Sequence, residues 1–358
     1  MGPPESESTL SSEQKGGRTM KKHYMGVDLH RNCFTVYRRE EDGSGKSQEW
    51  SIRSLKAFAK TVKAKDEVAV EATGNVRLFC EALKGRGCRV VVVNPHQFQV
   101  ISRSVKKTDE HDAKVLAEFL SKGMLPEVRM KDEEHARVAS LAQTRDKLVK
   151  LRTTLKNKVN NLLAARGILI RKESLSSEKG LAEVLASPVS ELERMELEIL
   201  VGEIRHLNES IKKLEELLRD RGSKLPGWKN VRSIKGIGDT GGSILLSTIG
   251  NIEDFEDEGK LAAYFGIVPR VSNSNETQRS GRITKRGCKL GRTALVQCAL
   301  IAARYSPYLQ KYYRRIAAAR GTGKAIIALA RKFLGIIYKT LKNNWIFEDF
   351  PQFVLAIG

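Results

Sequence analysis

The sequence predicts an α/β domain with a mixed sheet, then a long helical hairpin, then a mostly α-helical C-terminal domain. Three observations lead to this order. Three short apolar, β-prone runs come first and are followed by alternating helical and strand patterns, which is typical of an α/β domain. Two long stripes of apolar residues at helical spacing come next. A basic stretch with a helical pattern follows a Gly-containing turn.

In the first domain, the hydrophobic pattern alternates between strand and helix. Strands are expected over residues 24–29, 33–37, 48–52, 67–71 and 89–93, and helices over residues 54–64, 76–84 and 108–121. A turn signal at residues 41–45 separates the second and third strands. The continuous β-branched run at residues 89–93 is typical of a strand that is buried on both faces.

Two apolar stripes predict a pair of long helices. The first stripe is Val138, Leu141, Leu148, Leu151, Leu155, Val159 and Leu162. The second is Leu200, Ile204, Leu207, Ile211, Leu214 and Leu218, whose alternating spacing of four and three is a heptad seam. The two helices form either an antiparallel hairpin or a dimerising coiled coil. We expect a homo-oligomer, a dimer or a tetramer, with this hairpin as the oligomerisation device.

Composition shifts along the chain suggest five segments. They are a disordered tail at residues 1–22, the α/β domain at 23–125, the helical coiled-coil region at 126–222, the C-terminal domain at 223–345 and a C-terminal tail at 346–358. In the C-terminal domain a tight turn at residues 236–238 precedes an apolar helix, and a polar loop is expected from residue 270 to residue 281.

The charge balance points to a polyanionic partner. Lys and Arg number 63 against 42 Asp and Glu, so the formal net charge is +21, and nucleic acid is the usual partner of such a surface. An acidic membrane surface is the competitor, but no apolar run approaches the roughly 20 residues that span a bilayer. The five cysteines form no close pair, which indicates a reducing compartment. We expect a protein of the bacterial cytoplasm or nucleoid with no membrane partner.

Four acids are placed where a metal site needs them. Asp28 and Glu71 fall in expected strands, where acids are depleted, and Asp109 and Asp112 lie three apart at the start of an expected helix. Carboxylates converging in this way can hold two Mg²⁺ ions about 3.5–4 Å apart, an arrangement that activates a nucleophile at phosphorus. The alternative is that they are four surface acids, with the helix-start pair acting as cap and dipole partners.

The motifs around these acids resemble those of one transposase family. The stretches Gly26-Val27-Asp28-Leu29-His30, Val70-Glu71-Ala72-Thr73-Gly74, Asn94-Pro95 and Lys107-Thr108-Asp109-Glu110-His111-Asp112-Ala113 closely resemble the DEDD transposases of the insertion sequence 110 family, relatives of the Piv-type DNA invertases. The resemblance implies a RuvC-like first domain with a ribonuclease H fold. It also implies that Asp28, Glu71, Asp109 and Asp112 bind a catalytic Mg²⁺, with Mn²⁺ as the alternative ion. The roles of His30 and His111, which flank these acids, are left open.

A second stretch resembles the C-terminal transposase domain of the same family. It comprises Gly266-Ile267-Val268-Pro269-Arg270, the serines that follow, and Ile283-Thr284-Lys285-Arg286-Gly287. The resemblance implies a serine that attacks DNA phosphate and forms a covalent phosphoserine. The spacing places that serine at Ser274, with Ser272 as the alternative, because Asn275 stands where the family has Gly. Chemically, a serine hydroxyl needs a base or a metal to become a nucleophile.

Basic residues around this motif are expected to contact nucleic acid. They are Arg270, Arg279, Arg282, Lys285, Arg286, Lys289 and Arg292, joined by Lys106 and Lys107 beside the acids. Tyrosines between residues 305 and 313 can stack on bases or pack into the core. The Gly236-Ile237-Gly238 turn resembles a helix-hairpin-helix element, and a plain interhelical turn is equally compatible with it.

The sequence therefore predicts a transposase that cleaves and exchanges donor and target DNA with Mg²⁺ and a phosphoserine intermediate. The resemblance further implies a structured non-coding bridge RNA as guide. One alternative is a Mg²⁺-dependent nuclease of the Holliday-junction-resolvase type, which uses water in place of the serine. A Piv-like invertase and a non-catalytic nucleic-acid-binding protein are the others.

Overall fold

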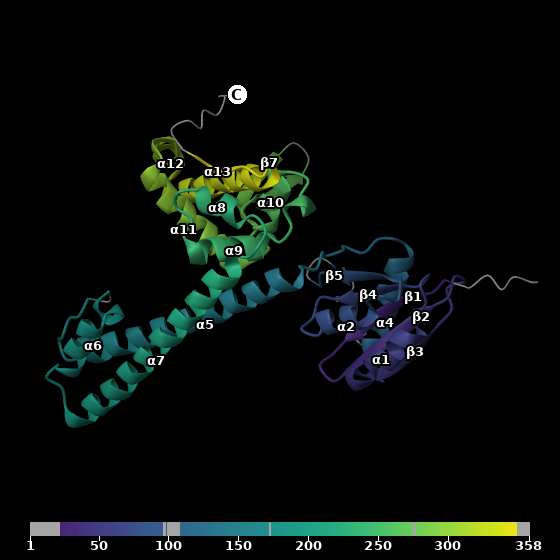
Figure 1. Ribbon diagram of the computed structural model, residues 1–358, viewed down its shortest axis with the longest axis horizontal. Helices are drawn as coiled ribbons and strands as arrows, with labels where there is room; N and C mark the ends of the chain where they lie inside the picture. Colours follow the sequence, from purple (N-terminus) through teal and green to yellow (C-terminus); the bar gives the residue numbers. More distant parts are fainter. Residues whose placement is uncertain (1–21, 96–97, 99–107, 172, 275–276, 349–358) are drawn as a thin grey trace, which may run out of the picture. The chain divides into compact units, whose positions relative to one another are not determined.

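A computed structural model describes residues 22–95, 98, 108–171, 173–274 and 277–348, with residues 271–280 described only along their backbone. The two expected tails lie outside the described residues, except for residues 22 and 346–348. The chain divides into two compact units, Met1–Met130 and Lys131–Gly358, and each has hydrophobic cores of its own. Figure 1 labels the elements of both units.

The first unit is built on a mixed sheet. Among the described residues it has five strands in the order β3-β2-β1-β4-β5. These are β1 (Tyr24–Leu29), β2 (Cys33–Arg39), β3 (Gly45–Ser51), β4 (Glu67–Glu71) and β5 (Arg89–Val93). The first three strands pair antiparallel, while β4 pairs parallel to β1 and β5 pairs parallel to β4. The predicted mixed α/β architecture is thereby confirmed.

Two helices cover one face of this sheet. They are α1 (Leu55–Thr61) and α2 (Val76–Leu83), and the short 3-10 turn η1 (Ile52–Ser54) leads into the first. Alternate residues of the strands, such as Val27 and Val70, point into this layer and are fully buried. Phe34 packs edge-on against Phe58 and Phe79 there, at ring-centroid distances of 5.2 and 5.7 Å. This aromatic cluster forms the core on that face of the sheet.

The opposite face carries helix α4 (Asp109–Ser121), and glycine makes this packing possible. A Cβ at Gly26 would lie 1.9 Å from the carbonyl oxygen of Ala113, so the helix backbone rests directly on β1. Leu116 and Leu120 of the same helix pack against Ala69 of β4 in a buried cluster. Asp28 and Glu71 lie two residues after Gly26 and Ala69 on their strands, so their side chains lie on this same face.

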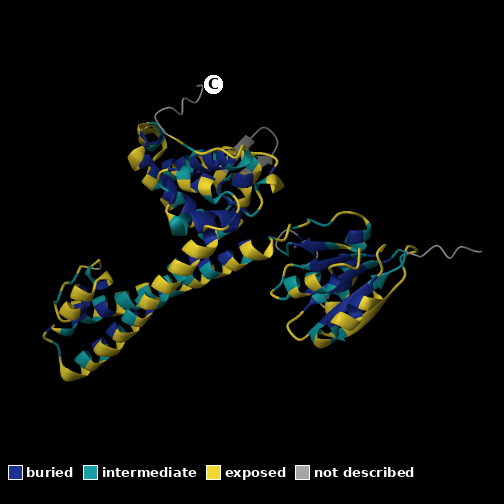
Figure 2. Cartoon of the chain, viewed as in Figure 1, coloured by how far each residue is buried: buried dark blue, intermediate teal, exposed yellow. Residues whose placement is uncertain are grey.

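In the second unit, helices α5 (Glu133–Ala164) and α7 (Glu191–Gly222) form an antiparallel hairpin. Their contacts run in opposite sequence directions: Arg145 Nε of α5 donates to Glu215 Oε1 at 2.8 Å, and Arg166 Nε, just after α5, donates to Glu193 Oε1 at 2.6 Å. The hairpin alternative is thus the one that the chain adopts. Leu151, predicted to lie in the apolar stripe, has half its area exposed. At the neighbouring position Arg152 donates to Asn208 Oδ1 of α7 at 2.8 Å, a polar contact between the two helices. Figure 2 shows buried and exposed residues alternating along both helices.

The two ends of this hairpin belong to different cores. At the connecting end, η2 (Ser174–Ser176) and α6 (Glu178–Leu185) pack over Val159, Leu163 and Leu197. At the other end, Val138 of α5 and Leu218 of α7 join the core of the C-terminal helices. Hydrophobic packing therefore continues from the hairpin into the C-terminal helices.

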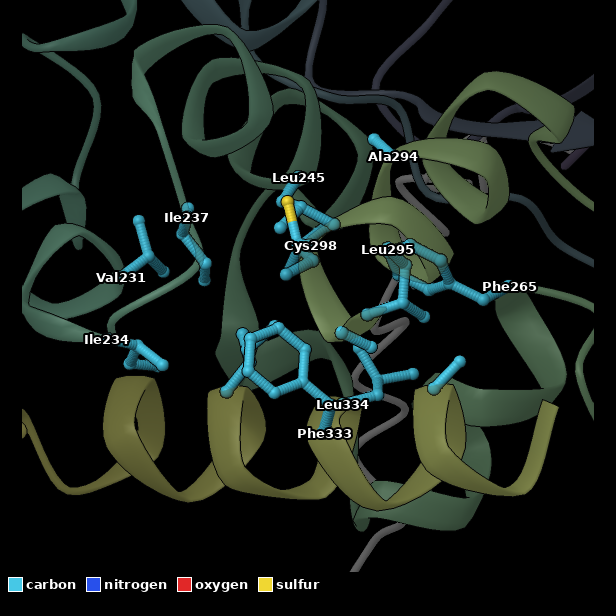
Figure 3. Packing of buried hydrophobic residues seen from close by; sticks show 14 of the residues in the cluster. Val231, Ile234, Ile237, Leu245, Phe265, Ala294, Leu295, Cys298, Phe333 and Leu334 are labelled. Carbon is cyan, nitrogen blue, oxygen red and sulfur yellow. The ribbon is translucent and has the colours of Figure 1, made fainter. Parts of the chain in front are cut away.

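The C-terminal core is helical, as expected. Its helices are α8 (Trp228–Ser233), α9 (Asp239–Ile249), α10 (Glu258–Tyr264), α11 (Lys289–Tyr305), α12 (Pro307–Arg320) and α13 (Thr322–Lys342), with a 3-10 turn η3 (Ile252–Asp254). Figure 3 shows Val231, Leu245, Leu295 and Phe333 meeting from four of these helices, and all four are fully buried. In the described part of the chain, no helix is long and apolar enough to cross a membrane.

The predicted polar loop at residues 270–281 is wrong, because this segment is a β-hairpin. Strand β6 (Pro269–Ser274) pairs antiparallel with β7 (Thr277–Ile283), and Ser274 stands opposite Thr277. The two strands pair through hydrogen bonds between their backbones, so the hairpin forms without an alternating pattern of apolar side chains. That alternation is the signal by which strands are recognised in a sequence.

Candidate functional site

The acidic site begins with Asp28, at the end of β1 where α4 starts. Ala113 of α4 lies over Gly26, so the first turn of the helix extends past the carboxyl end of the strand. Thr108 caps this turn by accepting a hydrogen bond from the backbone N–H of His111 at 3.2 Å. Asp109 and Asp112, both in the first turn, are thereby brought toward Asp28.

One histidine connects two of these carboxylates. His30 Nε2 lies 3.3 Å from Asp28 Oδ2 and 3.1 Å from Asp109 Oδ2. In the described part of the chain, Asp28, His30 and Asp109 form a group whose ligand atoms all lie within 4.8 Å of one another. Sequence reasoning left the role of His30 open. Its position two residues after Asp28, just beyond the strand, was the only signal in the sequence.

The electrostatics of the cluster centre on Asp28. Its side chain is 16% exposed, whereas that of Asp109 is 59% exposed. Burial raises the pKa of Asp28 above its ordinary value, and His30 acts in the opposite direction. The negative charges of Asp109 and Asp112 raise the pKa of Asp28 further. A cation placed among these groups would relieve that repulsion.

Glu71 stands beside Asp28 in the sheet but outside the group of three. Val70 pairs with Val27 across the parallel strands, so Glu71, the last residue of β4, stands level with Asp28 of β1. Both acids are half-buried and lie on the face that carries α4. Asp112 is also half-buried and interacts with Asp28 through its charge. The structure thus brings Asp28 and Asp109 together through His30, with Asp112 in the same first turn as Asp109 and Glu71 on the neighbouring strand.

The predicted nucleophile lies on the β-hairpin of the second unit. Ser274 ends β6 and Ser272 stands opposite Arg279, but the side chains of all three lie outside the described part of the chain. The base of the hairpin is closely packed. A Cβ at Gly266 would lie 2.1 Å from the carbonyl oxygen of Arg286, and one at Gly287 would lie 2.0 Å from that of Tyr264. These two glycines of the motif hold the hairpin against the end of α10.

The predicted basic residues have different surroundings. Lys106 and Lys107 lie outside the described residues. The exposed ones are Arg270, Arg282, Lys285, Arg286 and Lys289. Arg292 is half-buried, and its guanidinium donates to the carbonyl oxygens of Phe265 at 3.1 Å and Lys285 at 3.5 Å. Arg292 therefore supports the backbone that leads into and out of the β-hairpin.

The glycine turn before α9 is explained by packing. Gly236 has a left-handed φ of 108°, and a Cβ there would lie 2.7 Å from the backbone nitrogen of Ala302. Asp239, at the start of α9, pairs with Arg232 at 3.0 Å. An acid at this helix start would repel a phosphate, so the local charge does not favour the phosphate-binding alternative.

Fold and site together define a protein with a carboxylate cluster on a mixed α/β sheet and a separate basic helical unit. Residues 30–166 match a DEDD transposase model of the IS110 type, and residues 229–314 match the model described as "Transposase IS116/IS110/IS902 family". The first match includes Glu71, Asp109 and Asp112 and begins two residues after Asp28, while the second includes Ser274. The chain belongs to the IS110 family of DEDD transposases.

Individual relatives are similar over most of their length. The transposase for insertion sequence element IS1111A of Coxiella burnetii is 28% identical over 346 residues, which cover 94% of each chain. A probable family 20 transposase of Pseudomonas aeruginosa is 28% identical over 77% of this chain and 84% of its own. A pilin gene-inverting protein of Moraxella bovis is 25% identical over 92% of this chain and 98% of its own.

Proposed function

We propose that this transposase cleaves and exchanges DNA strands, using a divalent-ion site in its RuvC-like, ribonuclease-H-type first domain and a serine on the β-hairpin of its second unit. The observation that carries the proposal is the convergence of Asp28, His30 and Asp109, whose ligand atoms lie within 4.8 Å of one another. Asp112 adds negative charge to this point and Glu71 ends the adjacent strand.

The donor set fits Mg²⁺ or Mn²⁺, because such hard cations take carboxylate oxygens as ligands. Asp28, Asp109, Asp112 and Glu71 would hold the ion. Once bound, it would supply Lewis-acid stabilisation of charge at phosphorus. Imidazole is not a ligand that Mg²⁺ prefers, so His30 is not assigned as a metal ligand. Instead, His30 contacts the carboxylates of Asp28 and Asp109 and keeps both oriented toward the ion.

In the proposed mechanism the serine carries out strand exchange as a nucleophile. Ser274 Oγ forms a bond to the scissile phosphorus as the phosphodiester P–O bond on the leaving side breaks. The hydroxyl proton goes to a base, and the leaving oxygen takes up a proton. Attack by the hydroxyl of a second strand reverses the step and releases the serine, so the bond energy is conserved through a covalent intermediate. This requires the two units to act on the same phosphate, within one subunit or across two. A bridge RNA would supply sequence recognition.

A covalent protein–DNA adduct tests the mechanism. Protein with its co-purified RNA would be incubated with a supercoiled donor–target plasmid pair and Mg²⁺, then denatured. We expect an adduct with wild type and with Ser272→Ala, and none with Ser274→Ala, Asp109→Asn or EDTA. An adduct lost with Ser272→Ala alone would move the nucleophile to that residue. Cleavage without an adduct that survives Ser274→Ala would leave a resolvase-like nuclease that uses water.

DNA inversion is a second candidate, and one comparison favours it. The similarity to the pilin gene-inverting protein of Moraxella bovis extends over 92% of this chain. The same residues would then act on two sites in one molecule. A plasmid that carries two inverted candidate sites distinguishes the reactions: a flipped segment between intact sites indicates inversion, and joining to an unrelated target indicates transposition.

A further inference from the structure

A long groove runs across the second unit beside the base of the β-hairpin. It is lined by Pro269 and Ile283 of the hairpin, by Glu258 of α10, and by α12 and α13, and its volume is about 1360 Å³. Small-molecule pockets are usually about 300–1,000 Å³. The groove is therefore large for a metabolite and suits an extended ligand.

The rim of this groove is strongly basic. Its exposed cations are Arg282, Lys285, Arg320, Lys324, Arg331 and Lys339. Within the described part of the chain, none of the six forms an ion pair, and Glu258 is the one acid of the lining. Lys324, Arg331 and Lys339 recur at helical spacing, so one face of α13 presents charge along roughly 22 Å of helix. Uncompensated positive charge along a line matches a chain of phosphates.

The floor of the groove is apolar, unlike its rim. Ile267 and Ile336 are buried beneath it, while Ile283, Ile316 and Ile327 are half-buried and present part of their surface to it. The wall adds the half-buried ring of Tyr312, over which the ammonium of Lys332 lies at 5.4 Å from the ring centroid.

This combination favours an unpaired strand over a duplex. A duplex presents phosphates and sugars outward and keeps the faces of its bases stacked inside. Unpaired bases expose flat apolar faces, and proteins that bind single strands combine a basic groove with apolar and aromatic platforms. We propose that the groove binds an unpaired stretch of polynucleotide, with phosphates on the rim cations and bases over the isoleucines and Tyr312.

The location connects the groove to the reaction, and here the inference rests on the proposed function. Pro269 and Ile283 pair with each other at the groove, and Ser274 ends the same strand five residues further on. At about 3.4 Å per residue, the serine lies about 17 Å along the strand from the groove. An unpaired strand held in the groove can thus enter or leave the region of the nucleophile. Single-stranded DNA and single-stranded RNA share this chemistry.

Equilibrium binding tests the groove separately from catalysis. The full-length protein would be titrated in EDTA against labelled oligothymidine of about 12 nucleotides, oligouridine of the same length, and a duplex. The variant Arg331→Ala/Lys339→Ala should bind both single strands at least 10-fold more weakly, and its salt slope should fall by about 1.4, since each lost phosphate contact on a single strand removes about 0.7. The matched control, Lys311→Ala/Arg314→Ala, removes the same charge from exposed positions outside the groove.

Stacking is tested at Tyr312. Tyr312→Ala should weaken single-strand binding at least about fivefold and leave duplex binding unchanged, while Tyr312→Phe keeps the ring and the affinity. Tyr305→Ala, at an exposed position outside the groove, is the control. Whichever oligonucleotide binds with higher affinity, oligothymidine or oligouridine, identifies the natural ligand as DNA or RNA. Equal losses in groove and control variants, or equal losses for duplex and single strands, overturn the proposal.

Failure of the proposed function has a different signature. Ser274→Ala and Asp109→Asn should bind oligothymidine as wild type does, since neither residue lines the groove. If wild type forms no adduct but binds single strands normally, the proposed catalytic mechanism is contradicted and the groove proposal is not. Normal adduct formation with unaltered binding in the Arg331→Ala/Lys339→Ala variant would overturn the groove proposal alone.

Discussion

His30 Nε2 lies 3.1 Å from Asp109 Oδ2, so a residue just after strand β1 touches the first residue of helix α4. Because His30 also contacts Asp28, it acts as a positioning residue between two carboxylates. We expect His30→Ala to reduce strand cleavage by about 10-fold or more and to raise the Mg²⁺ concentration needed for half-maximal rate, as loss of a group that orients ligands does. His111→Ala, beside the same acids, is the matched control. Wild-type rates for His30→Ala at every Mg²⁺ concentration would contradict this role.

The charge repulsion around Asp28 should appear in the stability of the metal-free protein. Its folded pKa is raised above the ordinary value of 3.8, first by burial and then by Asp109 and Asp112, so the ionised form disfavours folding. This cost is absent below pH 3.8 and grows as the pH rises through the folded pKa. In EDTA, Asp112→Asn should therefore melt above wild type at about pH 7, and the gap should close near pH 3.5.

Metal addition reverses this comparison. Mg²⁺ binds only the folded cluster, so it should raise the melting temperature of wild type more than that of Asp112→Asn. Thermal melts with Mg²⁺ and with EDTA measure both effects. A wild-type melting temperature that Mg²⁺ leaves unchanged would argue against an ion site at these acids.

Gly26 should be intolerant of any side chain. A Cβ there would lie 1.9 Å from the carbonyl oxygen of Ala113, and a helix backbone cannot move aside as a flexible side chain can. We expect Gly26→Ala to destabilise the first unit by about 3 kcal/mol, the upper range for overpacking. Urea unfolding measures this. Gly74→Ala is the control, because a Cβ at Gly74 meets no atom within 4 Å. Equal unfolding midpoints for the two variants would contradict the close packing of α4.

The hairpin helix α7 should lose stability in acid through its first turn. Hydrogen bonds from Ser190 and Arg166 lower the pKa of Glu193 to about 2. A depressed pKa contributes stability that is present above the ordinary value of 4.5 and lost as the pH falls through about 2. Glu193→Gln should therefore melt below wild type at about pH 7, with a difference that fades in this window. Glu191→Gln, which removes the same charge from the same turn, is the control variant.

Two neighbouring arginines should separate stability from binding. Arg292 donates to the carbonyl oxygens of Phe265 and Lys285, so Arg292→Ala should cost about 1.5–3 kcal/mol of unfolding free energy. Arg286 is exposed, and Arg286→Ala should instead weaken duplex DNA binding and reduce its salt slope by about 0.9. Urea midpoints and salt-dependent binding distinguish the two. Loss of binding with unchanged stability in Arg292→Ala would show that this residue meets DNA directly.

Local patterns were sufficient for most elements of this chain. The bounds of α4 follow from its cap at Thr108 and its apolar period, and the heptad seam of α7 is visible as spacing alone. The mixed sheet follows from three β-prone runs ahead of the helix–strand alternation. Asp28 could be singled out from the sequence because acids are depleted in strands. Asp109 and Asp112 stand at a helix start, where acids are common, so family resemblance was needed to choose them.

Tertiary packing decided the rest. The contact of His30 with Asp109 exists because Gly26 lets α4 rest on β1, and no local pattern encodes a distance between two elements. The polar strands β6 and β7 satisfy each other through backbone hydrogen bonds that side-chain periodicity does not report. The isoleucines and cations of the groove come from the hairpin and the residues that flank it, and from α12 and α13, so their meeting depends on how buried surfaces pack. Sequence by itself determined most of the elements and the candidate acids, since apolar periodicity and motifs are local, whereas the fold alone determined which side chains face one another.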